Sequence, residues 1–333
     1  MPTLYLNEQG TRLGKKDERL IILRGQELIN DIPVIKVDRV IVMGQGVQVS
    51  HAAIVFLAQR GIPLIFTSQS GGSQKAMVSA GLGNNAALRL AQCRIVDNPN
   101  LAVPLVQAIV VGKVANQIQL LERYGSNWGG MGVRAKQTMQ HVIQQTQRMP
   151  DIDQLRGLEG AGAAAYWGAW SAVFKTAWGF AGRAYRPTPD PLNALLSFGY
   201  TLLLNDLMTA VQSLSFDPYL GIFHTVQFGR PSLALDLEEE FRPCIVDRMV
   251  LDVLDAGLLQ ISDFSRTEKG FLLNDRARKT FIQAYEQRMQ TPIRYPATGN
   301  NEPLRRVLLL QTQHLARVLQ GEEPRYQPYY WSD

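Results

Sequence analysis

The spacing of apolar residues changes near residue 80, and this change limits the possible folds more than any other feature of the sequence. Before it, short apolar runs are separated by Gly, Asn and Asp, which is typical of β-strands. After it, apolar residues recur every three or four positions, which is typical of amphipathic helices. The two patterns predict an α+β protein, with a small β-rich N-terminal domain followed by a larger all-α domain.

The N-terminal part is expected to contain short strands and one helix. Ser50 can cap this helix, the segment HAAIVFLAQ follows with helical spacing, and Gly61 ends it. Apolar runs bounded by turn residues predict strands at 3–6, 20–23, 34–36, 40–43 and 63–67.

A segment without periodicity separates the two patterns. The sequence AGLGNNA at 80–86 is typical of a linker. We therefore expect a β-rich domain over residues 1–80, a linker over 81–86 and a helical domain over 87–333. Apolar spacing predicts helices in the second domain at 87–97, 101–123, 131–148, 155–182, 191–213, 243–259, 276–289 and 303–320.

The composition suits a cytoplasmic protein with a polyanionic partner. A net charge of +5 and a pI near 9.2 are compatible with nucleic acid binding without proving it. Two cysteines without a CxxC pair indicate neither a disulfide framework nor a structural zinc site. No secretory signal is expected, and the most apolar stretch, Leu101–Ala115, is interrupted by Pro104, Gln107 and Lys113 and predicts no membrane span.

The last residues of the sequence, PRYQPYYWSD, are aromatic and contain two prolines. Such a segment is either a loosely packed end or a short docking segment. We expect the loosely packed end, because chain termini are usually poorly held.

Glu159 is the first residue whose surroundings suggest chemistry. It lies in LRGLEGAGAAAYWGAW, whose Gly and Ala residues would let another backbone approach the predicted helix closely. A glutamate in a close-packed helix is costly unless a cation or a hydrogen-bond donor compensates it. The alternative is an ordinary ion pair with Arg156 or with an Arg of another helix.

A second candidate segment, FHTVQFGRPSLALDLEEEFRPCIVD, holds His224 and an acidic run at the expected start of a helix. Acids at a helix start often only complement the helix dipole, and a lone histidine is usually structural. However, Asp236 and Glu239 are three residues apart and share one helical face with Arg242. Because apolar residues interleave with the acids, the run is more typical of a site than of a solvated surface.

These candidates form a ligand set of one imidazole and two or three carboxylates without a thiolate. Such a set suits Mn²⁺ or Mg²⁺ better than a structural zinc. An ion of this type polarises a phosphodiester and activates an attacking hydroxyl, so the set favours phosphate chemistry.

Long ordered motifs surround the candidates. The chain matches LxGLEGxxAxxYW around Glu159 and GxxHxxxxGRxSLAxDLxExFRPxxVD from Gly221 onward. Between them lies RPTPDPLNALLSFGYTLL at 186–203, and FLAQRGIPLIF at 56–66 and LRLAQCRIVDNP through KVANQ at 88–117 precede them. Together these motifs resemble the family of CRISPR-associated protein one, the integrase of spacer acquisition, over most of the chain.

The resemblance implies a role for each candidate. The family's metal-binding glutamate falls on Glu159, its histidine on His224 and its final acid on Glu239, with Asp236 as an accessory acid. The family's usual Met of DLMExF is Glu238 here, so the assignment depends on the register of three consecutive glutamates. The spacing from Asp236 to the FRP motif favours Glu239.

The resemblance also implies an activity. We expect a divalent-metal-dependent DNA integrase and endonuclease with Mg²⁺ or Mn²⁺ as cofactor and with Glu159, His224 and Glu239 as catalytic residues in the helical domain. It would insert short DNA fragments, the spacers, into a CRISPR repeat array by attack of a 3′-hydroxyl on a phosphodiester. The implied partners are DNA, a second copy paired through the β-rich domain, and the small CRISPR-associated protein two.

Two other functions are compatible with the same residues. One is a stand-alone metal nuclease that acts on branched DNA, and the other is a non-catalytic DNA-binding scaffold with salt-bridged carboxylates. In each case, contacts with DNA phosphates need only basic side chains on one surface. The candidates, each of which could instead be solvated or ion-paired, are Arg60, Lys175, Arg183, Arg186, Arg242 and Arg248.

Overall fold

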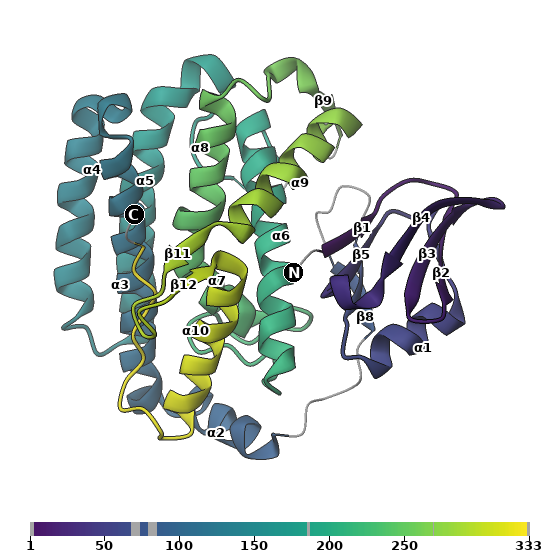
Figure 1. The fold of residues 1–333 in the computed structure, drawn as a ribbon. Coiled ribbons are helices and arrows are strands. Elements are labelled where there is room, and N and C mark those ends of the chain that lie inside the picture. The colour runs from purple at the N-terminus through teal and green to yellow at the C-terminus, as the bar shows by residue number, and fades with distance from the viewer. Residues whose placement is uncertain (1–2, 68–73, 79–84, 185–186, 269, 332–333) are drawn as a thin grey trace. The chain divides into compact units, whose positions relative to one another are not determined.

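The computed structural model describes residues 3–67, 74–78, 85–184, 187–268 and 270–331. It divides into two compact units, Met1–Gly83 and Asn84–Asp333. The first unit is rich in strands, and the second is mostly helical (Figure 1). The predicted α+β class, with a small β-rich part before a larger helical part, is confirmed. Most of the predicted linker lies outside the described residues.

In its described residues, the first unit contains two sheets of four strands each. The strands are β1 (Thr3–Leu6), β2 (Thr11–Lys16), β3 (Arg19–Arg24), β4 (Glu27–Pro33), β5 (Arg39–Met43), β6 (Gln48–Val49), β7 (Leu64–Thr67) and β8 (Gln74–Val78). One sheet has the order β1-β5-β7-β8, with β1, β5 and β7 parallel and β8 antiparallel. The other has the order β4-β3-β2-β6.

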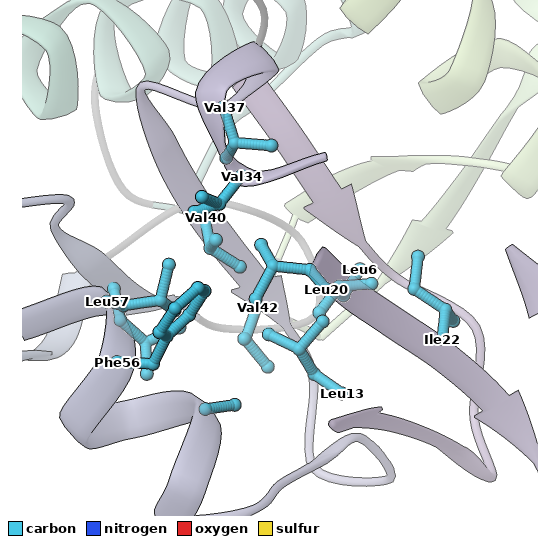
Figure 2. Packing of buried hydrophobic residues seen from close by; sticks show 12 residues of the cluster. Leu6, Leu13, Leu20, Ile22, Val34, Val37, Val40, Val42, Phe56 and Leu57 are labelled. Carbon is cyan, nitrogen blue, oxygen red and sulfur yellow. The ribbon is translucent and has the colours of Figure 1, made fainter. Parts of the chain in front are cut away.

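Apolar side chains from both sheets and from helix α1 (His51–Gln59) form the core of this unit. Val42 of β5, Leu13 of β2 and Phe56 of α1 belong to one buried cluster (Figure 2). Ser50 caps α1, because its hydroxyl accepts a hydrogen bond from the N–H of Ala53 at 3.2 Å. The predicted helix and its cap are therefore confirmed.

The predicted strand at 34–36 is wrong. These residues form a 3₁₀ turn, closed by a hydrogen bond from the N–H of Val37 to the carbonyl oxygen of Val34 at 2.9 Å. Val34 is buried and Ile35 is exposed, an alternation that a turn produces as readily as a strand. Strand β4 was not predicted. Its first five residues are all exposed, so buried and exposed side chains do not alternate along them.

The second unit consists of helices α2 (Ala86–Val96), α3 (Pro99–Arg123), α4 (Gly125–Thr146), α5 (Ile152–Trp178), α6 (Pro191–Ser213), α7 (Ser232–Phe241), α8 (Arg248–Asp255), α9 (Asp275–Gln290) and α10 (Leu304–Leu319). It also contains two hairpins, formed by β9 (Phe264–Thr267) with β10 (Gly270–Leu273) and by β11 (Pro292–Arg294) with β12 (Asn301–Pro303). The sequence did not predict these hairpins within the helical domain, because strands of three or four residues are too short to show a period.

Helices α3 and α6 are long and apolar enough to cross a membrane by length and composition alone. Their most apolar windows are 61% and 78% buried inside the protein, respectively. Helix α3 packs against α4, α5 and α7, and α6 packs against α7 and α10. Packing in the interior of the helical unit therefore accounts for their composition.

Helix α7 begins earlier than the sequence suggests. Its first residue is Ser232, so the acidic residues Asp236–Glu240 occupy its middle and last turns and not its start. The helix dipole therefore does not explain them. The chain continues through a π-helical turn, Arg242–Asp247, into α8. Pro243 has no N–H to donate in this turn, which favours a departure from α-helical hydrogen bonding.

The segment 326–331 packs into the helical unit, so the predicted loosely packed end is wrong. Tyr326, Tyr329 and Trp331 are buried. The side chain of Asn116 on α3 donates to the carbonyl oxygen of Tyr329 at 2.8 Å and accepts from the N–H of Trp331 at 2.8 Å. These partners are far away in the sequence, where local composition gives no sign of them.

Candidate active site

Three helices and one loop bring the candidate residues into contact around the amino group of Lys113. Lys113 lies on α3, Glu159 on α5 and Glu239 on α7. The ammonium group forms ion pairs with Glu159 and with Oε2 of Glu239, the latter at 2.6 Å. His224, between α6 and α7, places Nε2 3.7 Å from Oε1 of Glu239. The three residues expected as ligands are thus joined through direct contacts and one lysine.

Asp236 fixes the orientation of His224. Its carboxylate accepts hydrogen bonds from the backbone N–H groups of Ile222 (2.5 Å), Phe223 (3.0 Å) and His224 (2.8 Å). Oδ1 also lies 2.7 Å from Nδ1 of the imidazole. This contact directs Nδ1 toward Asp236 and turns Nε2 toward Glu239. The contacts of Asp236 are those of a residue that orients His224, and its accessory role toward a metal ion stays a prediction.

The loop that carries His224 is tied to two helices. Arg156 of α5 donates from Nη2 to the carbonyl oxygen of Phe223 at 2.7 Å. Ser232, at the start of α7, donates from Oγ to the carbonyl oxygen of Thr225 at 3.0 Å. A Cβ atom at Gly221 would lie 2.4 Å from Cβ of Ser232, so this approach of loop and helix requires glycine.

The small residues near Glu159 pack less closely than the sequence suggests. A Cβ atom at Gly162 would lie 3.4 Å from Val114 of α3 and 3.6 Å from Val142 of α4. A Cβ atom at Gly157 or Gly160 would meet no atom within 4 Å. Among these three glycines, only Gly162 therefore matches the predicted close approach.

The three consecutive glutamates of α7 are all buried, and each has a different set of partners. Glu238 accepts from Nη2 of Arg242 at 2.6 Å. Glu239 accepts from Nη1 of the same guanidinium at 2.5 Å and faces the α3 lysine and the histidine. Glu240 points to the segment 326–331, where it accepts from the hydroxyl of Tyr326 at 2.5 Å.

These surroundings give the three carboxyl groups different pKa values. Burial raises the pKa of Glu238 to about 7 despite the charge of Arg242. Burial also raises the pKa of Glu240 to about 8. Burial acts in the same direction on Glu239, but its basic neighbours, Arg242 first, hold its pKa well below its ordinary value. Glu239 therefore stays ionised at neutral pH, as a cation ligand must.

Lys113 is a site residue that the sequence analysis missed. Burial alone would lower the pKa of its amino group, but the charges of Glu239 and Glu159 raise the pKa above its ordinary value. The available signal is a lysine inside Leu101–Ala115, the most apolar stretch, where it was interpreted only as an interruption. A buried lysine needs an anionic partner, and this requirement points to the site.

The donor atoms fit a divalent cation by their chemistry. His224 offers Nε2, and Glu159 and Glu239 offer carboxylate oxygens, a set that suits Mg²⁺ or Mn²⁺. Oε2 of Glu239 is buried and has no well-directed hydrogen bond from the residues that the structure describes, although the lysine lies close to it. Within the described residues, no group of three His, Cys, Asp or Glu side chains is arranged to hold a metal directly. Lys113 and Arg242 lie between these side chains and hold their oxygens.

A small cavity of about 60 Å³ adjoins these residues. Its lining includes Lys113, Glu159, Arg242 and Gln117, which is one helical turn beyond the lysine on α3. Oε1 of Gln117 is buried and has no hydrogen-bond partner in the part of the chain that the structure describes. The lining of the cavity thus includes a buried acceptor that lies four residues from the lysine on α3.

Comparison with known proteins identifies the family. The family described as CRISPR associated protein Cas1 matches residues 4–287. The chain belongs to the Cas1 family. A Cas1 relative from Rhodospirillum rubrum, described as CRISPR-associated endonuclease Cas1 2, is 36% identical over 99% of this chain and 98% of its own length. The predicted family is confirmed.

Solved structures share the Cas1 fold of this chain. A casposase bound to integration product has a TM-score of 0.85 and 21% identity, and the match covers 100% of this chain and 96% of the casposase chain. A Cas6-RT-Cas1–Cas2 complex has a TM-score of 0.84 and 21% identity, and the match covers 100% of this chain and 36% of the other. At these identities the similarity shows the fold.

The basic residues expected to contact DNA in this Cas1 chain differ in their surroundings. Lys175 is exposed in the last turn of α5. Arg60, directly after α1, is ion-paired with Glu18. Arg183 donates hydrogen bonds to side chains of α6. Arg186 lies outside the described residues, and contact of any of these residues with DNA stays a prediction.

Arg242 and Arg248 are engaged within the protein. Arg242 is bound to the two glutamates described above, inside the site. The guanidinium of Arg248 lies 4.9 Å from the ring centre of Trp331, and its Nε lies 3.6 Å from Oδ2 of Asp252. Contact with DNA at either arginine would compete with these interactions, so both are weaker candidates than Lys175.

Proposed function

We propose that this chain is a divalent-metal-dependent DNA integrase and endonuclease that inserts short DNA fragments into a CRISPR repeat array. The observation that carries the proposal is the contact network of Glu239, which links His224 with Lys113 and, through the lysine, with Glu159. The endonuclease description of the Rhodospirillum rubrum relative and the fold shared with a casposase bound to integration product support cleavage and joining of DNA.

Each residue of the site has its own task. Glu159, His224 and Glu239 would hold Mg²⁺ or Mn²⁺, which polarises the phosphodiester and lowers the pKa of the attacking hydroxyl. Asp236 keeps the imidazole in the orientation that directs Nε2 toward Glu239. Arg242 fixes the carboxylate of Glu239 and helps to keep it ionised.

The proposed reaction is a transesterification. The oxygen of a donor 3′-hydroxyl attacks a phosphorus atom of the repeat DNA and forms a new P–O bond. The P–O bond to the leaving 3′-oxygen breaks, the attacking hydroxyl gives its proton to solvent, and the leaving 3′-oxygen takes up a proton from solvent, so that one 3′-hydroxyl is consumed and one is released. If water replaces the donor hydroxyl, the same site hydrolyses DNA, so one site accounts for both activities.

The proposed partners are DNA, a second copy of the chain and Cas2. The complex with Cas2 among the structural neighbours supports a Cas2 partner. We place the protein in the cytoplasm and assign a symmetric dimer contact to residues 1–80, because a small strand-rich unit buries little apolar surface and gains from pairing. A sedimenting species near the monomer mass of 37.2 kDa at micromolar concentration would contradict the dimer.

A strand-transfer assay tests the activity. A labelled duplex with free 3′-ends is mixed with a supercoiled plasmid that carries a repeat, with Mn²⁺ and with or without the Cas2 partner. We expect covalent joining of label to plasmid with the wild-type chain and its loss in Glu159→Ala. Glu122→Ala is the matched control, because Glu122 is an exposed glutamate of α3. Cleavage of branched DNA without joining would favour the stand-alone nuclease, and binding without chemistry would favour the scaffold.

A further inference from the structure

The amino group of Lys113 lies among the oxygens that the proposed function assigns to a divalent cation. Lys113 is buried on α3, and its ammonium group contacts Glu159 on α5 and Oε2 of Glu239 on α7. A divalent cation binds carboxylate oxygens at roughly 2.0–2.6 Å, depending on the ion. The cation and the ammonium group therefore require the same carboxylates.

The ammonium group also has an electrostatic task in the protein. Two buried or half-buried carboxylates without a cation repel each other and are costly to desolvate. Glu239 has Arg242 as a second cation, whereas Lys113 is the ion-pair partner that the structure shows for Glu159. The lysine is therefore the group that joins α5 and α7 through their acids.

We propose that Lys113 is a built-in counter-ion of the site, which holds Glu159 and Glu239 in position and competes with the divalent cation for their oxygens. This inference rests on the proposed function, because it concerns the same ligands. Lys113 is a positioning residue in the protein before metal binds, and its displacement is part of metal binding.

The structure provides a second position for the displaced ammonium group. The cavity beside the site is lined by Lys113 and Gln117, which are four residues apart on α3. Residues with this spacing lie on the same face of a helix. Oε1 of Gln117 is buried without a hydrogen-bond partner among the described residues, and a buried unpaired acceptor is unfavourable. The ammonium group can satisfy this acceptor when it leaves the two glutamates.

A purely structural salt bridge predicts the opposite effect on metal binding. If Lys113 only stabilises the local fold, its removal disorders the glutamates and weakens binding of a cation. If Lys113 competes with the cation, its removal strengthens binding, because two oxygens become free and one positive charge is removed. The sign of the change in affinity therefore separates the two explanations.

The test measures Mn²⁺ affinity of the purified full-length chain by calorimetry and by electron paramagnetic resonance. We expect Lys113→Met to lower the dissociation constant about tenfold, since removal of one charge at a few ångströms is worth roughly 1.4 kcal/mol or more at this depth. The melting temperature in EDTA should fall, whereas the stabilisation by Mn²⁺ should increase. Lys113→Gln is a second neutral variant in case the first does not fold.

Gln117→Leu tests the second position, and it should raise the dissociation constant for Mn²⁺ because the ammonium group loses its alternative acceptor. In the double variant Lys113→Met/Gln117→Leu this effect should vanish, since no ammonium group remains to be accommodated. Arg305→Met is the matched control, because Arg305 is a cation of α10 that is ion-paired with Asp206 and Glu286. It should lower stability and leave the dissociation constant unchanged.

The outcomes separate the two proposals. If the folded Lys113→Met chain binds Mn²⁺ as tightly as the wild-type chain or more weakly, the proposal that Lys113 is a counter-ion is overturned. Mn²⁺ binding by the wild-type chain still supports the proposed function in that case. Absence of Mn²⁺ binding by the wild-type chain, with the Lys113→Met chain also unable to bind, overturns the metal site and the counter-ion together. Tighter binding by Lys113→Met, with loss of the Gln117→Leu effect in the double variant, supports the counter-ion.

Discussion

Helix α7 presents two adjacent glutamates to two different surroundings. Glu239 faces the side chains of Lys113 and Arg242, and its pKa lies well below its ordinary value. Glu240 faces the segment 326–331, where it accepts a hydrogen bond from Tyr326, and burial raises its pKa to about 8. Both side chains are buried, so burial does not decide which of them can hold a cation.

The charge of the partners makes the difference. A buried carboxylate with cationic neighbours stays ionised and can exchange those neighbours for a divalent ion. A buried carboxylate with neutral donors is held as a proton-bearing group near neutral pH. Glu239 and Glu240 therefore lie on two different faces of α7. The face of Glu239 contacts the cationic side chains of the site, and the face of Glu240, called the packing face, contacts the segment 326–331. Substitutions on the two faces should have separable effects.

The largest expected effect comes from the isosteric pair Glu239→Gln and Glu240→Gln. We expect Glu239→Gln to slow strand transfer by about 100-fold or more, because a ligand loses its charge. Glu240→Gln should stay within about threefold of wild type, because its partner is a neutral hydroxyl. Initial rates at saturating Mn²⁺ measure both. A loss of activity in Glu240→Gln alone would shift the ligand register by one residue.

A smaller loss is expected when the orienting carboxylate is changed. Asp236→Asn places an amide N–H₂ where the backbone and Nδ1 of His224 need an acceptor. Changes in groups that orient a metal-bound histidine typically cost 10–100-fold, and we expect a loss of activity in that range. Asp252→Asn, on the exposed side of α8, is the control. An unchanged rate in Asp236→Asn would show that the imidazole needs no orienting group.

On the packing face, the buried carboxyl group of Glu240 should make the free energy of unfolding depend on pH. The pKa of Glu240 is raised from 4.5 to about 8, so between these values the folded chain retains a proton that the unfolded chain has released. The free energy of unfolding therefore falls as pH rises through this window, by on the order of a few kcal/mol. Glu240→Gln should reduce this fall, because an amide remains neutral. Urea unfolding in EDTA at pH 5, 7 and 9 measures the difference, and parallel curves for both chains would exclude this role for Glu240.

The smallest effect is expected for Glu238, which shares Arg242 with the ligand. Glu238→Gln leaves Glu239 in contact with Arg242 and Lys113 and should change the strand-transfer rate by less than about tenfold. The same assay compares it with Glu239→Gln. A greater loss in Glu238→Gln than in Glu239→Gln would reverse the assignment made from the DLxExF spacing.

Sequence was sufficient where one residue or one ordered motif determines the local structure. The predicted helix 191–213 has the same bounds as α6, which starts with Asp190 as cap and Pro191 in its first turn. Ser50 likewise marks the start of α1. The candidate ligands were predicted because they belong to motifs with fixed spacing.

Sequence was insufficient where function depends on contacts between distant segments. Lys113 meets Glu159 across 46 positions, and Tyr326 meets Glu240 across 86, so no local spacing signals either contact. The hydrogen bonds that Asp236 accepts from the backbone of residues 222–224 were also not predicted, because they form only when the loop folds back on α7. These errors share one cause: a contact between residues that are far apart in the sequence produces no periodic pattern in that sequence.

The packing of the segment 326–331 means that α3 and α7 gain some of their hydrogen-bond partners only after these late residues have been synthesised. Asn116 pairs with the backbone of Trp331 across 215 positions, and Glu240 obtains its partner from the same late segment. The β-rich unit is complete within the first 83 residues and can fold while translation continues, whereas α3 and α7 must wait. Chains that stop before Tyr326 lack these hydrogen-bond partners, so we expect their helical unit to be less stable than that of the full chain.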